Sequence, residues 1–206
     1  MKPGDFFVGV LDFFAALLPG AIATWLVLAY VDPDELSHAD VTHGVEAAYL
    51  LTSYILGHFA FAVGALLDPT YDRWRERRHP PGTDVVYLAA DKLRHAIAPD
   101  LGPSKGRDAY STLQWARAYV AVHASDARTE IDTLEANSKF FRTLVVVLAA
   151  ACLHFLFYEH RLGFAAASAV AVALSFERYC DRRWKMTQLT YATAVVLNGP
   201  KPRAQP

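Results

Sequence analysis

The sequence predicts an all-α membrane protein with four transmembrane helices and a helical cytoplasmic subdomain between the second and the third. Hydrophobic residues make up 53% of the 206 residues and charged residues only 20%. The hydrophobic residues gather into four runs, and nearly all the basic residues lie on one side of those runs. This composition excludes a disordered chain. The formal charge of -1 argues against a partner such as a nucleic-acid duplex.

The first apolar run extends from Phe6 to Val31 and carries a single charge, Asp12. At 1.5 Å per residue, a helix of this length spans a bilayer with some tilt. A cleaved signal peptide fits less well, because only Lys2 precedes the run and an apolar signal core is about 7–15 residues long. The Pro19-Gly20 pair predicts a kink in the middle of this helix.

The second run extends from Val45 to Leu67 and ends at Asp68-Pro69. The third and fourth runs, Thr143–Tyr158 and Leu162–Phe176, are separated by a polar turn. Each of these two is about 24 Å long as a helix, somewhat less than the ~30 Å hydrocarbon core. Either flanking arginines extend them by snorkelling, or the two form a re-entrant hairpin. Of these alternatives, we expect full spans.

Basic residues predict the orientation. Of the 20 Lys and Arg residues, 19 fall on one side of the four runs, and only Arg161 falls on the other. The positive-inside rule then places both termini in the cytoplasm of a bacterial inner-membrane protein. The predicted organisation is an N-terminal transmembrane hairpin over 1–67 (helices about 6–31 and 45–67), a cytoplasmic helical subdomain over 68–140, a C-terminal transmembrane hairpin over 141–178, and a cytoplasmic amphipathic helix and tail over 179–206.

Helical patterns fill the cytoplasmic segments. Asp84–Ala98 predicts a short helix, and a longer pattern begins at Ser104. A second helix start at Ser125 leads directly into the third apolar run. Trp184–Leu197 predicts a further amphipathic helix that Gly199-Pro200 ends.

Two stripes of small residues run along the predicted membrane helices at helical spacing. Such stripes allow close helix packing, either within one subunit or between subunits. Two stripes exceed what one small bundle needs, which favours a homo-oligomer. Their members are Ser53, Gly57, Ala60 and Gly64 in the second run, and Gly163, Ala167, Ala171 and Ser175 in the fourth.

Polar groups inside the apolar runs are candidates for packing hydrogen bonds or for the lining of an ion path. The rise of 1.5 Å per residue gives the depth of each residue in the membrane. Asp12 and His58 lie at similar depths and form one possible pair, and Glu46 and His154 form another. The complete set of intramembrane polar candidates is Asp12, Glu46, Tyr49, Ser53, His58 and His154.

The densest charged cluster is predicted where the runs emerge on the cytoplasmic side. It is either a collar of salt bridges or a pocket in which arginines bind an anionic ligand or lipid headgroup and aromatic rings stack on it. The candidate ligand-binding residues are Tyr71, Arg73, Trp115, Arg117, Arg142, Arg178 and Trp184. The acids of the same collar are Asp68, Asp72, Glu135, Glu177 and Asp181.

Two segments carry a resemblance. Through Leu134-Glu-Ala-Asn-Ser-Lys-Phe-Phe-Arg142 and Asp68-Pro-Thr-Tyr-Asp72, the chain resembles small bacterial multi-pass inner-membrane proteins without an assigned activity. The resemblance implies a bacterial inner-membrane setting and brings no catalytic residue with it. Sequence motifs for a nucleophilic serine, a phosphate-binding loop or a zinc site are absent, so no catalytic residue, metal or cofactor is expected.

Together these features predict a homo-oligomeric channel or membrane-permeabilising effector, with phage defence as one setting. A small anionic, nucleotide-like ligand at the cytoplasmic collar would gate it. One alternative is a lipid-modifying membrane enzyme that uses Asp68, Asp72, Glu177 and Asp181. Another is a non-catalytic subunit of a membrane complex.

Overall fold

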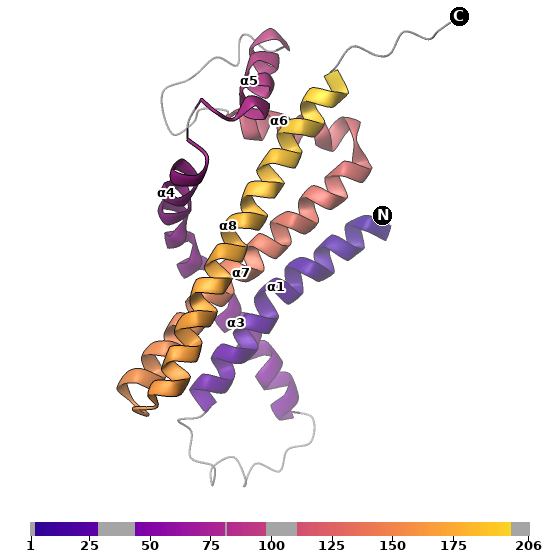
Figure 1. The fold of residues 1–206 in the computed structure, drawn as a ribbon. Helices are drawn as coiled ribbons and strands as arrows, with labels where there is room; N and C mark the ends of the chain where they lie inside the picture. Colours follow the sequence, from indigo (N-terminus) through magenta and orange to yellow (C-terminus); the bar gives the residue numbers. More distant parts are fainter. Residues whose placement is uncertain (1–2, 29–43, 81, 98–110, 199–206) are drawn as a thin grey trace, which may run out of the picture. The chain divides into compact units, whose positions relative to one another are not determined.

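The protein is described here from a computed structural model, which covers residues 3–28, 44–80, 82–97 and 111–198. Every regular element within these ranges is a helix, so the predicted all-α class is confirmed (Figure 1). Two helical stretches, Glu46–Arg78 and Ser125–Phe157, are long and apolar enough to cross a membrane.

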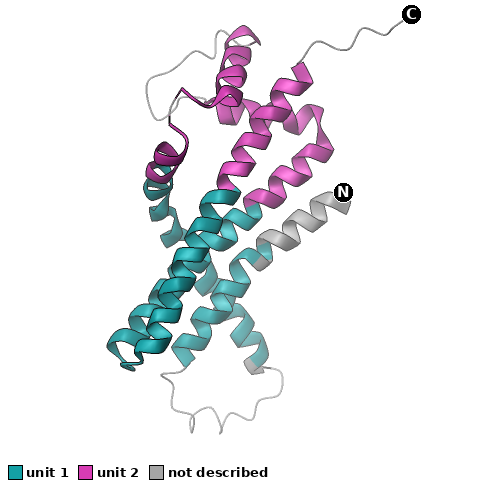
Figure 2. Ribbon diagram, in the orientation of Figure 1, with its two compact units in different colours: residues 1–72, 136–182 teal, residues 73–135, 183–206 magenta. Residues whose placement is uncertain are grey.

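The chain divides into two compact units (Figure 2). Unit 1 comprises residues 1–72 and 136–182, and unit 2 comprises residues 73–135 and 183–206. Two long helices contribute residues to both units: α7 (Ser125–Phe157) and α8 (Leu162–Asn198). The α-helices that lie wholly within unit 1, among the described residues, are α1 (Pro3–Leu28) and α3 (Gly44–Gly64).

Helices α1 and α3 of unit 1 cross at close range because glycine stands at the crossing point on each helix. A Cβ atom added at Gly20 would lie 1.7 Å from the carbonyl oxygen of Ser53. One added at Gly57 would lie 2.1 Å from the carbonyl oxygen of Ala16. Neither position has room for a side chain, so Ser53 and Gly57 of the small-residue stripe pack against α1 of the same chain, whereas Gly64 faces Arg142 of α7.

The second apolar run ends at Asp68, but the helical backbone continues beyond it. A short 3-10 turn, η1 (Ala65–Leu67), leads into α4 (Asp68–Arg78). Proline is tolerated in the first turn of a helix, where its missing N–H has no intrahelical partner to lose, so Pro69 does not stop α4. Helix α4 ends at Arg78 instead, and α5 begins at Val85.

Unit 2 contains α5 (Val85–Ile97) and α6 (Thr112–His123) together with the first part of α7 and the last part of α8. A capping box starts α6: Ser111 Oγ accepts from the Gln114 N–H, and the Gln114 side chain accepts from the Ser111 N–H. The helix start expected at Ser104 lies outside the described residues.

The core of unit 2 is apolar and built by four helices. Its buried members are Ala90, Trp115, Ala116, Val120, Ile131, Met186, Tyr191 and Ala194. Burial of this set gives unit 2 the interior of an ordinary helical bundle.

Helices α7 and α8 form a hairpin in unit 1, joined by a short turn (Figure 1). The helix start expected at Ser125 is the first residue of α7, which continues through the third apolar run. The fourth run and the segment Trp184–Leu197, expected as separate helices, form the single helix α8. The charged residues between them contain neither proline nor glycine, so nothing interrupts the backbone.

Large apolar side chains are exposed along the helices of unit 1. Only 22% of the most apolar window in each of the two long candidate spans is buried. A core helix of a water-soluble protein would be mostly buried, whereas these faces leave a broad apolar surface uncovered. Examples from all four helices are Leu18, Trp25, Leu50, Leu51, Phe59, Leu153, Phe157, Phe164, Val170 and Leu174.

Candidate ligand-binding site

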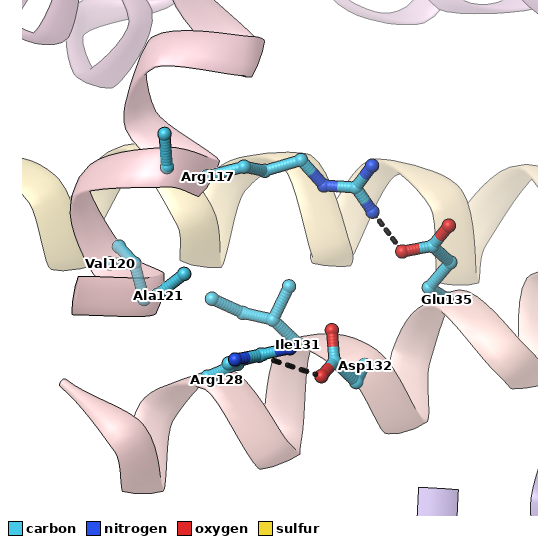
Figure 3. Close-up of a pocket in the computed structure, with 8 residues that line it drawn as sticks. Arg117, Val120, Ala121, Arg128, Ile131, Asp132 and Glu135 are labelled. Atoms are coloured by element: carbon cyan, nitrogen blue, oxygen red, sulfur yellow. Dashed lines mark hydrogen bonds and ion pairs between the residues drawn. The ribbon is translucent and has the colours of Figure 1, made fainter. Parts of the chain in front are cut away.

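A cavity of about 370 Å³ opens in unit 2 between α6 and the first turns of α7 (Figure 3). Its lining combines two arginines, two acids and four apolar residues. The lining residues are Arg117, Ala118, Val120, Ala121, Arg128, Ile131, Asp132 and Glu135. The buried side chains of Val120 and Ile131 line the cavity and also belong to the core of unit 2. The base of the cavity is therefore formed by packed core residues.

Each arginine of the cavity is paired with an acid. Arg117 Nη2 donates to Glu135 Oε2, which ties α6 to α7, as Figure 3 shows. Arg128 Nε lies 3.4 Å from Asp132 Oδ2, one turn further along α7. The Arg117 side chain is 38% exposed and that of Arg128 is 55% exposed, so solvent and solutes reach both guanidinium groups.

The charges of the four ionisable side chains cancel when all are ionised. A guanidinium group has five N–H donors, and each arginine here gives only part of them to its acid. A monovalent anion would compete with the two carboxylates for the guanidinium groups, and it would gain little binding energy because it replaces one single negative charge with another. An anion with several negative charges can engage both guanidinium groups at once, as phosphate groups do with paired arginines.

The aromatic residues expected to stack on a ligand have other partners. Trp115 is buried and stacks on Tyr119, with ring centroids 5.6 Å apart. Trp184 stacks on His79 at 3.9 Å. Tyr71 is buried in unit 1, where its ring lies 5.8 Å from that of Tyr179. None of the eight described residues that line the cavity is aromatic.

A second cluster joins three helices of unit 1. Arg142 on α7 and Asp68 on α4 form an ion pair of 3.4 Å, and the phenol of Tyr179 on α8 donates to the same carboxylate oxygen at 2.9 Å. The Arg142 guanidinium also lies over the ring of Phe61, 4.4 Å from its centroid. The Arg142 guanidinium therefore has a carboxylate and an aromatic ring as partners within unit 1.

The other collar residues divide between the two units. Asp72, Glu177 and Arg178 are exposed in unit 1, where Asp181 is half-buried, and Arg73 is exposed in unit 2. The structure therefore joins Arg117 with Glu135 and Asp68 with Arg142 from the predicted collar. Among the described residues, no group of three or more His, Cys, Asp or Glu side chains is arranged to hold a metal ion.

The intramembrane polar candidates lie mainly in helix contacts. Ser53 Oγ donates to Thr24 Oγ1 at 3.0 Å, and Tyr49 Oη donates to the carbonyl oxygen of Ala21 at 3.0 Å. His154 lies 3.0 Å from Glu159. The His58 ring packs edge-on against Tyr54 at 4.4 Å.

Two of these candidates take no part in a described pair. Glu46 is exposed on α3. The side chain of Asp12 lies outside the described residues, and its expected pairing with His58 lies there too.

Sequence reasoning did not select Arg128, Asp132 or Tyr179 as site residues. Arg128 and Asp132 are four residues apart, a spacing that places them on one helix face and identifies them as a pair. Tyr179 has no such local signal, because its partner Asp68 is 111 residues away in the chain.

Comparison with protein-family models, with curated proteins and with solved structures gives no match.

Proposed function

We propose that this protein is a multi-pass bacterial inner-membrane protein that forms a homo-oligomeric channel or membrane-permeabilising effector, gated by a small multivalent anion in the cavity of unit 2. Its four apolar segments cross the membrane, and both termini lie in the cytoplasm. The exposed apolar faces of α1, α3, α7 and α8 in unit 1 support the membrane location. The concentration of 19 of the 20 basic residues on one side supports the orientation.

One observation supports the gating proposal: helix α7 contains both residues that line the cavity and an apolar segment that is a candidate membrane span. Arg128, Asp132 and Glu135 lie in the first turns of α7, and the apolar part of the same helix follows from Thr143. An anion that binds Arg117 in place of Glu135 removes an ion pair between α6 and α7. A continuous helix then carries that change toward its apolar part without a flexible linker.

The ligand class follows from the cavity. Its volume of about 370 Å³ suits a small molecule, and its two guanidinium groups suit phosphate oxygens. We propose a phosphate-bearing anion of the size of pyrophosphate or a nucleotide. The cavity recognises the phosphates and leaves any base outside it.

The pore belongs to an assembly of copies in this proposal. Ser53 and Tyr49 are engaged in the α1–α3 contact, so the pore runs between chains and not through one of them. The small residues Gly163 and Ala167 on α8 support such an assembly, because Gly163 has open space around it and Ala167 is exposed.

Ion flux from liposomes that contain the purified protein tests the proposal, with inorganic pyrophosphate and ATP as probes. Flux should begin on addition of a probe, and Arg117→Gln or Arg128→Gln should raise the required concentration about tenfold, the loss of one charge-assisted contact. Arg77→Gln, at an exposed position outside the cavity, is the matched control and should respond as the unaltered protein does.

Absence of flux with and without both probes, in a protein shown to be oligomeric and inserted, would overturn the channel proposal. A probe response that Arg117→Gln and Arg128→Gln leave unchanged would overturn the assignment of the ligand to this cavity.

A further inference from the structure

Arg117 of the anion cavity contacts α8 as well as α7. Its Nη2 atom donates to Glu135 Oε2 on α7, and the same atom lies 4.0 Å from the thioether sulfur of Met186 on α8. All three side chains belong to unit 2. Met186 is not among the described residues that line the cavity, so any effect of this methionine on an anion passes through Arg117.

The core of unit 2 and a neighbouring threonine fix the position of Met186. The residue is 7% exposed and belongs to the buried core set. The hydroxyl of Thr190, one turn further along α8, lies 3.9 Å from the same sulfur and donates to the carbonyl oxygen of Met186 at 2.8 Å. Methionine has a flexible, unbranched side chain, and burial restricts it here. Its sulfur therefore stands at a defined place beside the guanidinium group.

The two partners of Arg117 differ in charge. The carboxylate of Glu135 is an anion, so it competes with a bound anion for the guanidinium N–H groups. The thioether sulfur of Met186 is uncharged and only a weak acceptor, so it does not compete in this way. An anion that displaces Glu135 thus leaves the contact with Met186 available to hold the guanidinium group at the cavity.

Prior placement of Arg117 matters because its side chain is long and partly exposed. It is 38% exposed, and an arginine loses rotamer freedom when a ligand fixes it. Contacts that restrict the side chain before the anion arrives reduce this loss, which is the general basis of preorganised binding. Met186 supplies such a contact from outside the cavity.

We infer that Met186 is a positioning residue of the anion cavity: it holds the Arg117 guanidinium group for the ligand and links the cavity to α8. The inference rests on the proposed function and extends it. A multivalent anion that engages Arg117 acts through Glu135 on α7 and through Met186 on α8. Both helices of the hairpin therefore respond to one guanidinium group.

Methyl NMR of the full chain in detergent tests the contact, because Met1 and Met186 are the only methionines in the sequence. Labelling the methionine methyl groups with carbon-13 gives one signal for each, and the signal lost in Met186→Leu identifies Met186. Arg117→Gln removes the guanidinium group beside the sulfur and should shift the Met186 signal. Arg77→Gln, the same substitution at an exposed arginine outside the cavity, is the matched control and should leave it in place. Inorganic pyrophosphate should also shift this signal in the unaltered protein.

Isothermal titration calorimetry with pyrophosphate measures the effect on binding. Met186→Leu keeps an apolar side chain of similar volume and removes the sulfur, so helical content and thermal stability should change little. Affinity for pyrophosphate should fall about threefold, which is part of the cost of ordering one arginine side chain. Leu93→Met is the matched control, because it makes the reverse exchange on α5 against the same core, and it should bind as the unaltered protein does.

The two measurements separate failure of this inference from failure of the proposed function. A Met186 signal that Arg117→Gln leaves in place would overturn the contact with α8. Equal affinities of Met186→Leu and Leu93→Met for pyrophosphate would overturn the positioning role. If the unaltered protein binds neither pyrophosphate nor ATP, the proposed ligand is wrong, and a Met186 signal that moves in Arg117→Gln still supports the link from Arg117 to α8.

Discussion

Arg142 and Asp68 form an ion pair between α7 and α4 in which the arginine side chain is only 13% exposed. The same carboxylate accepts from the buried phenol of Tyr179 on α8. Three helices of unit 1 thus meet at one acid. Removal of that acid leaves a guanidinium group buried without its counter-charge, which costs more than the pair itself contributes.

Asp68→Ala should therefore lower the free energy of unfolding of unit 1 by about 2 kcal/mol, less than for a fully buried pair because Asp68 is itself partly exposed. Thermal unfolding in detergent, followed by circular dichroism, measures the change. Tyr179→Phe removes one hydrogen bond and should cost only about 1 kcal/mol. If Asp68→Ala unfolds at the temperature of the unaltered protein, the ion pair has no structural role.

Gly57→Ala should separate α1 from α3. Its added Cβ would lie 2.1 Å from a backbone oxygen, and backbone atoms cannot move aside as the end of a side chain can. We expect a loss of about 2 kcal/mol, typical of forced overpacking, in the same unfolding measurement.

Gly163→Ala is the matched control for that substitution. No atom lies within 4 Å of its added Cβ, and alanine favours a helix over glycine by up to about 1 kcal/mol. Its stability should therefore stay the same or rise slightly. Equal losses from the two variants would contradict the close α1–α3 crossing.

Ser53→Ala distinguishes packing from pore lining. The buried hydroxyl donates to Thr24 on the neighbouring helix, so its loss should reduce stability by about 1 kcal/mol. Single-channel conductance should remain that of the unaltered protein, since the side chain faces α1. A change of conductance without a change of stability would place Ser53 in the pore instead.

Ser111→Ala removes the side-chain acceptor at the start of α6. An N-cap serine contributes about 1 kcal/mol, and here the reciprocal bond from Gln114 is weakened with it. Hydrogen exchange of the backbone amides at the start of α6 should speed up about fivefold. Ser125→Ala, at the start of α7, is a useful comparison, because its side chain bonds to Asp126 at a longer 3.4 Å. Unchanged exchange at α6 in Ser111→Ala would contradict the capping box.

Local sequence was sufficient for most of the helices and for some of their ends, although not for α4, which continues past Asp68-Pro69. The helix start at Ser125 was expected because a capping residue precedes a run with helical spacing. The continuity of α8 was not expected, since the change from apolar to charged residues after Phe176 suggested a new element. Composition changes there, but no residue breaks the backbone, and a helix ends only where its hydrogen bonds are interrupted.

The partners of the polar side chains could not be predicted from local sequence. Arg117 and Glu135 were both selected as site residues, and the structure pairs them across α6 and α7. Arg142 was selected as a ligand-binding residue, and its guanidinium group is held by Asp68 and Phe61. Both arginines look alike in the sequence, because residue type alone does not tell which neighbour another helix supplies.

The apolar and basic patterns by themselves determined that this chain is helical, where its apolar segments lie, and that its charges are segregated along it. Hydropathy and helical spacing are properties of consecutive residues, so no knowledge of long-range contacts is needed for them. Only the tertiary structure decided that Ser53 bonds to Thr24, that Asp68 joins α4, α7 and α8, and that Arg117 faces a cavity. These partners depend on the register at which helices cross, and in unit 1 that register is set where the backbone of α1 touches α3 at Gly20 and Gly57.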